Sequence, residues 1–134
     1  MDGVILTPLK KIGHSKGDIF HAIKSSDVGF SGFGEAYFSE IHKDQTKGWK
    51  KHTRMTLNII VAIGAIDFVI YDEESKQYFK TAISHQNYKR LTIQPGLWVS
   101  FTGIEDRNVL LNVASIEHDP EESVNVVLDS FDYY

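Results

Sequence analysis

The segment from residue 55 to residue 71 constrains the fold most strongly, because it contains two strand-like runs joined by a single glycine. Residues 57–63 and 65–71 are rich in Ile, Val, Ala and Phe, and only Gly64 separates them. Each run is too short and too β-branched for a helix, so both are predicted to be strands. We expect them to be neighbouring strands of a closed or double-layered sheet.

Further short strands are predicted along the chain. They are residues 35–41, 78–83, 89–93, 97–102 and 109–115. The polar stretch 72–76 predicts a hairpin connection, and the Pro95-Gly96 pair predicts a tight turn. Residues 18–25 fit either a short helix or a further strand. About seven short strands with little helical periodicity after residue 34 indicate an all-β protein, either a sandwich or a jelly roll.

Length and composition favour one domain without covalent cross-links. A chain of 134 residues is of single-domain size, so we expect residues 1–134 to form one domain with a sizeable core. The absence of cysteine excludes thiolate catalysis and disulfides and fits a reducing compartment. No signal-like N-terminal segment is visible, and Asn58 and Asp67 interrupt the longest apolar run. We therefore expect a soluble cytoplasmic protein with no membrane partner.

The net charge of −4 is unevenly distributed along the chain. Residues 1–54 carry nine Lys and Arg against six Asp and Glu, whereas residues 103–134 carry one against eight. This distribution argues against a nucleic-acid partner, which requires a broad basic face. One local cationic cluster fits either a bound pyrophosphate or a solvated lysine-rich turn. The cluster consists of Lys47, Lys50, Lys51 and Arg54.

Four motifs give the chain a resemblance to a known family. They are GEAYFS at 34–39, KGWKKH at 47–52, NYKRLTIQPG at 87–96 and SIEHDPE at 115–121. In this order and spacing they resemble the cupin-fold nucleotide-sugar isomerases, the group of dTDP-4-dehydrorhamnose 3,5-epimerase and the dTDP-sugar 3,4-ketoisomerases. The resemblance implies a cupin-type jelly roll and a homodimer. It also implies a small-molecule substrate, a dTDP-linked 4-keto-6-deoxysugar, in deoxysugar and polysaccharide biosynthesis.

The comparison with metal-binding cupins argues against a metal or another cofactor. Those proteins carry a His-x-His pair and a further histidine after the Pro-Gly turn. Here Lys50 stands two positions before His52, and residues 97–100 contain no histidine. An ammonium group repels a divalent cation, and one imidazole does not hold it, so we expect no metal and no cofactor.

The resemblance also implies which residues carry the chemistry. Enolisation beside the C4 ketone requires a base, a donor for the enolate oxygen and an acid that returns the proton. His52 is the expected base, since imidazole exchanges protons near neutral pH. Lys50 is a second candidate base or a cation beside the enolate, and Tyr37 is the candidate donor if it is not an ordinary core aromatic. His118 stands where the epimerases carry an acid tyrosine and is the candidate acid.

Six residues are expected to contact the substrate. They are Lys47, Arg54, Asn58, Lys89, Arg90 and Trp98. Cations fit the pyrophosphate, and strand alternation predicts that only one of Lys89 and Arg90 faces inward. Trp98 fits stacking on thymine or sugar, or ordinary core packing. Asn58 lies in an apolar strand and requires a partner, either a ligand or a neighbouring strand.

The sequence thus predicts a metal-independent enzyme, an isomerase that acts as a 3- or 3,5-epimerase on a dTDP-linked 4-keto-6-deoxysugar. A dTDP-sugar 3,4-ketoisomerase is a nearly equal alternative. A non-catalytic nucleotide-sugar-binding cupin is the alternative from another class. The absent acid tyrosine and the presence of Lys50 favour the binding protein, whereas His52 and Tyr37 favour the enzyme.

Overall fold

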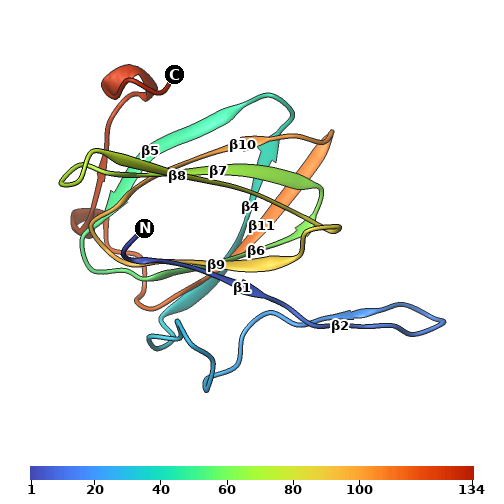
Figure 1. Cartoon of the computed structure of the whole chain (residues 1–134). Helices are drawn as coiled ribbons and strands as arrows, with labels where there is room; N and C mark the ends of the chain where they lie inside the picture. The colour runs from blue at the N-terminus through green and yellow to red at the C-terminus, as the bar shows by residue number, and fades with distance from the viewer.

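Two five-stranded antiparallel sheets face each other in the computed structural model, which describes residues 1–134 (Figure 1). The first sheet, in spatial order, consists of β1 (Val4–Pro8), β9 (Lys89–Ile93), β6 (Leu57–Ile63), β11 (Arg107–Ala114) and β4 (Glu35–His42). The second sheet consists of β12 (Ser123–Asn125), β5 (Thr46–His52), β10 (Trp98–Gly103), β7 (Ala65–Asp72) and β8 (Gln77–Ser84). The prediction of an all-β, double-layered jelly roll of the cupin type is confirmed.

The remaining elements are short. Strands β2 (Lys11–Ile12) and β3 (Ile19–Phe20) form a hairpin that projects away from both sheets (Figure 1). Two 3-10 turns, η1 (Pro120–Glu122) and η2 (Leu128–Ser130), lie near the C-terminus. Residues 18–25 therefore contain a strand of two residues and no helix. No helix in the chain is long and apolar enough to cross a membrane.

The seven strands predicted from the sequence are all present, with ends shifted by at most two residues. The hairpin connection predicted at 72–76 is confirmed, because it joins β7 to β8. Three strands of the two main sheets were not predicted. Strand β5 was predicted to be a polar corner, since its sequence contains three lysines, a glycine and a histidine and no aliphatic residue. Strands β1 and β12 are too short and too mixed in composition to stand out.

Gly64 is a crossing point between the two sheets. Strand β6 pairs with β9 and β11, whereas β7 pairs with β10 and β8, so the expectation that these segments are neighbours in one sheet is corrected. Gly64 has φ +79°, and a β-carbon there would collide with the Arg107 carbonyl oxygen and the Asn108 side chain. Glycine is required because the chain must turn tightly against another strand at this point.

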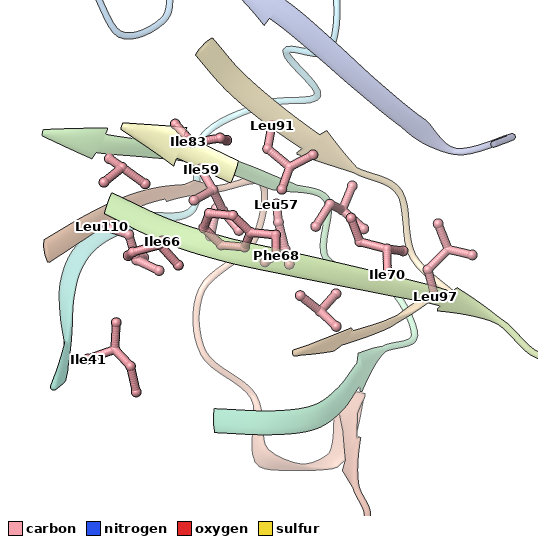
Figure 2. Close-up of a cluster of buried hydrophobic side chains, with 14 of the residues drawn as sticks. Ile41, Leu57, Ile59, Ile66, Phe68, Ile70, Ile83, Leu91, Leu97 and Leu110 are labelled. Carbon is pink, nitrogen blue, oxygen red and sulfur yellow. The ribbon is translucent and has the colours of Figure 1, made fainter. Parts of the chain in front are cut away.

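The core fills the space between the sheets. Alternate residues of β6 and β7 point inward, as strand geometry requires. Leu57 and Ile59 on β6 lie close to Phe68 and Ile70 on β7 (Figure 2). Full burial of one such side chain stabilises the fold by roughly 1.5–3 kcal/mol, so this alternation determines which face of each strand turns inward.

A second apolar cluster covers the outer face of the second sheet. Trp49, Tyr71 and Trp98 are buried there beneath the C-terminal strap, which we define as residues 126–134. Trp49 and Val126 exchange two backbone hydrogen bonds of 3.0 and 3.1 Å, and the Trp49 indole nitrogen donates to the Leu128 carbonyl at 3.1 Å. The strap is thereby held alongside β5, as the C-terminal trace indicates (Figure 1).

Candidate active site

A cavity of about 380 Å³ opens between the two sheets, next to β4 and β5. Its floor is apolar and is formed by core residues such as Leu57, Ile59 and Val99. Its walls carry polar side chains from both sheets, and none of the lining residues is acidic. The polar side chains are Tyr37, Ser39, Lys47, Lys50, His52, Asn112 and Asn125. The cavity thus combines a dry floor with cationic and neutral hydrogen-bonding groups, which suits a polar anionic ligand.

His52 lines this cavity at the end of β5, and its ring is 9% exposed. Its Nδ1 atom is hydrogen-bonded to Oε1 of Glu122, a carboxylate that is 3% exposed. The other carboxylate oxygen accepts backbone N–H groups of Thr53, Arg54 and Met55 at 3.1–3.2 Å. The carboxylate is therefore held rigidly by the chain that follows β5.

The pKa of Glu122 reflects two opposing effects. Burial raises the pKa of the carboxyl, but the hydrogen bond with His52 and the backbone N–H groups of Arg54 and Met55 outweigh burial and hold it below its ordinary value. The carboxylate is ionised at neutral pH, so it accepts a hydrogen bond from the Nδ1–H group of the imidazole. In the neutral imidazole with the proton on Nδ1, Nε2 is the nitrogen that can accept a proton.

Glu122 was not predicted as a site residue. It follows Pro120 and Glu121 in an acidic stretch that resembles a solvated tail, and 70 positions separate it from His52. No local periodicity marks a contact of this kind. The one available signal was the position of Glu122, directly before residues 123–125, which can pair with the strand that carries His52.

Tyr37 lies on β4 and lines the same cavity. It is 41% exposed, so it is not an ordinary core aromatic. Its hydroxyl accepts a hydrogen bond of 3.1 Å from Nδ2 of Asn112, the directly opposite residue on β11. The sequence prediction did not include Asn112, which lies between aliphatic residues of a buried strand.

Lys47 and Lys50 supply the positive charge of the cavity. Lys47 donates to the Glu40 carbonyl oxygen at 2.6 Å and to Ser39 Oγ at 3.3 Å. Lys50 is half-buried, and it lies opposite Val99 on β10 and Asn125 on β12. No carboxylate forms a salt bridge with Lys50 within the chain, so its charge is available to a ligand.

Three predicted site residues lie outside the cavity. His118 is exposed and does not line the cavity. Arg54 is exposed and forms a 2.8 Å salt bridge with Asp119. Lys89 is half-buried on β9 at the far side of the first sheet from β4. The structure therefore does not bring the expected acid, His118, close to His52.

Three further predicted residues point away from the cavity, because side chains along a strand alternate between its two faces. Arg90 is fully buried and donates to the carbonyl oxygens of Ala22 and Val28 at 2.7 and 3.2 Å. Asn58 donates to the Gly29 carbonyl at 3.0 Å, so both residues hold the loop outside the first sheet. Trp98 lies under the C-terminal strap on the outer face of the second sheet. Their inward neighbours on the same strands are core residues.

The chain contains no group of three or more His, Cys, Asp or Glu side chains placed to hold a metal ion.

Comparisons with known proteins agree with this geometry. The family model FdtA, described as "WxcM-like, C-terminal", matches residues 2–131. No curated protein sequence matches the chain. The crystal structure of a dTDP sugar isomerase from Desulfovibrio desulfuricans G20 shares 31% identity and a TM-score of 0.91, over 96% of this chain and 87% of that chain.

Two structures of lower identity show the same fold. QdtA, a sugar 3,4-ketoisomerase from Thermoanaerobacterium thermosaccharolyticum in complex with TDP, has 20% identity and a TM-score of 0.81, over 92% of this chain and 88% of that chain. RmlC from Legionella pneumophila, a dTDP-6-deoxy-D-glucose-3,5-epimerase, has 16% identity and a TM-score of 0.84, over 96% and 74%. The resemblance inferred from the four motifs is confirmed, and the chain belongs to the FdtA family, WxcM-like, C-terminal.

Proposed function

We propose that the protein is an isomerase of a dTDP-linked 4-keto-6-deoxysugar that acts by enolisation next to the C4 ketone. The observation that carries the proposal is that His52, which is hydrogen-bonded to Glu122, lines one cavity with Tyr37 and Lys50. A relative with 31% identity is a dTDP sugar isomerase. Other structures with this fold are a sugar 3,4-ketoisomerase and a 3,5-epimerase.

The cavity contains candidates for the base and for the oxyanion donors of the enolisation step. Nε2 of His52 takes the proton from C3, the electrons of the C3–H bond form the C3=C4 double bond, and the C4 carbonyl oxygen becomes an oxyanion. The Glu122 carboxylate stabilises the imidazolium that forms. The Lys50 ammonium group and the Tyr37 O–H stabilise the oxyanion in a cavity with an apolar floor, where such interactions are stronger than in water.

The charge of the cavity supports an anionic substrate. Lys47 and Lys50 line the cavity, and no Asp or Glu does. A nucleoside diphosphate carries its charge on the pyrophosphate, which lysine recognises as a point charge. Electrostatic recognition of this kind is weakened by salt, so we expect substrate binding to weaken as ionic strength rises.

Within this class we infer 3,4-keto migration. Epimerisation requires a proton donor on the face of the sugar opposite the base, and double epimerisation requires such a donor at two carbons. His118, the expected second acid, is exposed and outside the cavity, where His52 is the one imidazole. Keto migration needs one base that carries a proton from C3 to the adjacent C4, while the O3 hydroxyl proton is transferred to the C4 oxyanion, so that a C3 ketone and a C4 hydroxyl form.

The experiment is NMR of the protein with dTDP-4-keto-6-deoxyglucose in deuterated water. Deuterium at C4 of a 3-keto product supports keto migration. Deuterium at C3, or at C3 and C5, with the 4-ketone retained would identify an epimerase instead. Saturable binding with neither exchange nor conversion would support the non-catalytic alternative, and the absence of exchange, conversion and binding would contradict the proposal.

The proposal includes a homodimer of single-domain subunits that works in the cytoplasm. The homodimer rests on the family resemblance, the location rests on the absence of cysteine, and the single domain is supported by the core that both sheets share. Sedimentation velocity at several protein concentrations tests the dimer, since a monomer at all concentrations would contradict it.

A further inference from the structure

Asn112 is a buried amide with a fixed partner at each end. It is 1% exposed and lies on β11, opposite Tyr37 of β4 and Ile59 of β6. Its Oδ1 atom accepts the backbone N–H of Asn58 at 3.1 Å. Its Nδ2 atom donates to the Tyr37 hydroxyl at 3.1 Å. The side chain thus connects three strands of the first sheet at the wall of the cavity.

The orientation of this amide follows from its partners. A backbone N–H can only donate, so the atom of Asn112 that faces Asn58 must be the acceptor Oδ1. The atom that faces Tyr37 is then Nδ2, which can only donate. The Tyr37 hydroxyl oxygen therefore accepts in this hydrogen bond, and its own O–H proton is not used by Asn112.

We propose that Asn112 is a positioning residue that directs the Tyr37 O–H proton toward the substrate. Because the phenol oxygen is occupied as an acceptor, the hydroxyl is free to donate into the cavity that both residues line. This inference rests on the proposed function, and it explains how the oxyanion donor, the Tyr37 O–H, is oriented. As negative charge develops on the substrate, the Asn112 N–H polarises the Tyr37 hydroxyl and strengthens its donation.

Two substitutions of Asn112 test the direction of this hydrogen bond. N112D keeps the size and the acceptor for the Asn58 N–H, but its second carboxylate oxygen accepts and turns the Tyr37 O–H away from the cavity. Loss of one oxyanion donor lowers kcat by roughly 100-fold, with KM little changed. N112S is the neutral second variant. It removes the Nδ2 donor without adding charge and is also expected to lower kcat.

The matched control is the same pair of substitutions in the Y37F background. If Asn112 acts through the Tyr37 hydroxyl, N112D and N112S cause no further loss of kcat once that hydroxyl is absent. A direct electrostatic effect of the new carboxylate, or a purely structural role of Asn112, would lower kcat equally in both backgrounds and would overturn the proposal. Unchanged kcat in both single variants would overturn it as well.

A measurement without turnover separates this inference from the proposed function. In the 1H–15N spectrum, the Asn112 side-chain NH₂ signals are expected to shift upfield in Y37F, because Nδ2 loses its acceptor. The Asn58 amide signal is expected to keep its position. Unchanged Asn112 side-chain signals would overturn the orientation of the amide. A wild-type protein that neither exchanges nor converts the sugar, but shows this shift in Y37F, would disprove the proposed function and leave the orientation intact.

Discussion

Nδ1 of His52 is hydrogen-bonded to Oε1 of Glu122, whose other carboxylate oxygen is held by three consecutive backbone N–H groups. Strand β12 begins directly after Glu122 and pairs with β5, the strand that ends with His52. The pairing of these two strands therefore brings together a base and a carboxylate that are far apart in sequence. The first two predictions concern this contact.

E122Q is expected to lower kcat by roughly 1000-fold while dTDP binding is retained. The three backbone N–H groups fix the amide oxygen of the new side chain, so its NH₂ group faces Nδ1 and forces the imidazole into the tautomer with a protonated Nε2. Turnover is measured by NMR and affinity for dTDP by calorimetry. A wild-type rate in E122Q would remove the carboxylate from the mechanism.

Glu122 is also expected to make stability depend on pH. Hydrogen bonds hold its pKa in the folded state below the ordinary value of 4.5, despite the opposing effect of burial. A carboxyl with a lowered folded-state pKa stabilises the fold above its unfolded-state pKa, and this contribution is lost as pH falls through the folded-state value. Urea unfolding of wild type and E122Q between neutral and acidic pH measures it. The difference in unfolding free energy is expected to shrink toward low pH, and a constant difference would contradict the assignment.

Lys50 and Lys51 form a matched pair of neighbours on opposite faces of β5. K50Q removes the positive charge that lines the cavity and is expected to lower kcat/KM by roughly 10–100-fold. K51Q makes the same charge change on the outer face, where Lys51 lies 4.7 Å from the Trp98 ring centroid and pairs with Glu73. Its kcat/KM is expected to stay close to wild type. Equal losses in both variants would indicate a long-range charge effect.

The C-terminal strap is expected to contribute measurably to stability. Phe131 has its ring centroid 4.6 Å from that of Tyr71 and 5.5 Å from that of Trp49. F131A removes these contacts and is expected to cost about 2 kcal/mol of unfolding free energy, followed by circular dichroism in urea. V127A in the same segment is the control, because Val127 is 70% exposed. An equally large loss in V127A would mean that the contacts of Phe131 are not the cause.

The sequence allowed accurate prediction of strands where short apolar, β-branched runs are bounded by turn residues. Residues 57–63 and 65–71 are strands, and Tyr37, Lys50 and His52 line one cavity. These three residues lie in two of the four motifs that carry the family resemblance, although 47–52 was expected to be a corner and not a strand. Their catalytic roles stay predictions.

The predictions for Arg90, Asn58 and Trp98 depended on which face of a strand points toward the cavity. Both faces of these strands are buried, so the sequence pattern did not identify the inward face. Arg90 and Asn58 lie beneath an outer loop, and Trp98 lies beneath the C-terminal strap. An apolar setting therefore did not distinguish the inner face of these strands from the outer one. Glu122 was missed for a different reason, because its contact with His52 forms only once β12 has paired with β5.

The burial of both tryptophans under the C-terminal strap has an optical consequence. Trp49 is 0% exposed and Trp98 is 4% exposed, and the chain has no other tryptophan. Neither side chain lines the cavity. The tryptophan fluorescence of the protein therefore originates entirely on the outer face of the second sheet. Its emission reports whether the C-terminal strap is docked, and a change on ligand addition would signal motion of β5 transmitted through the sheet.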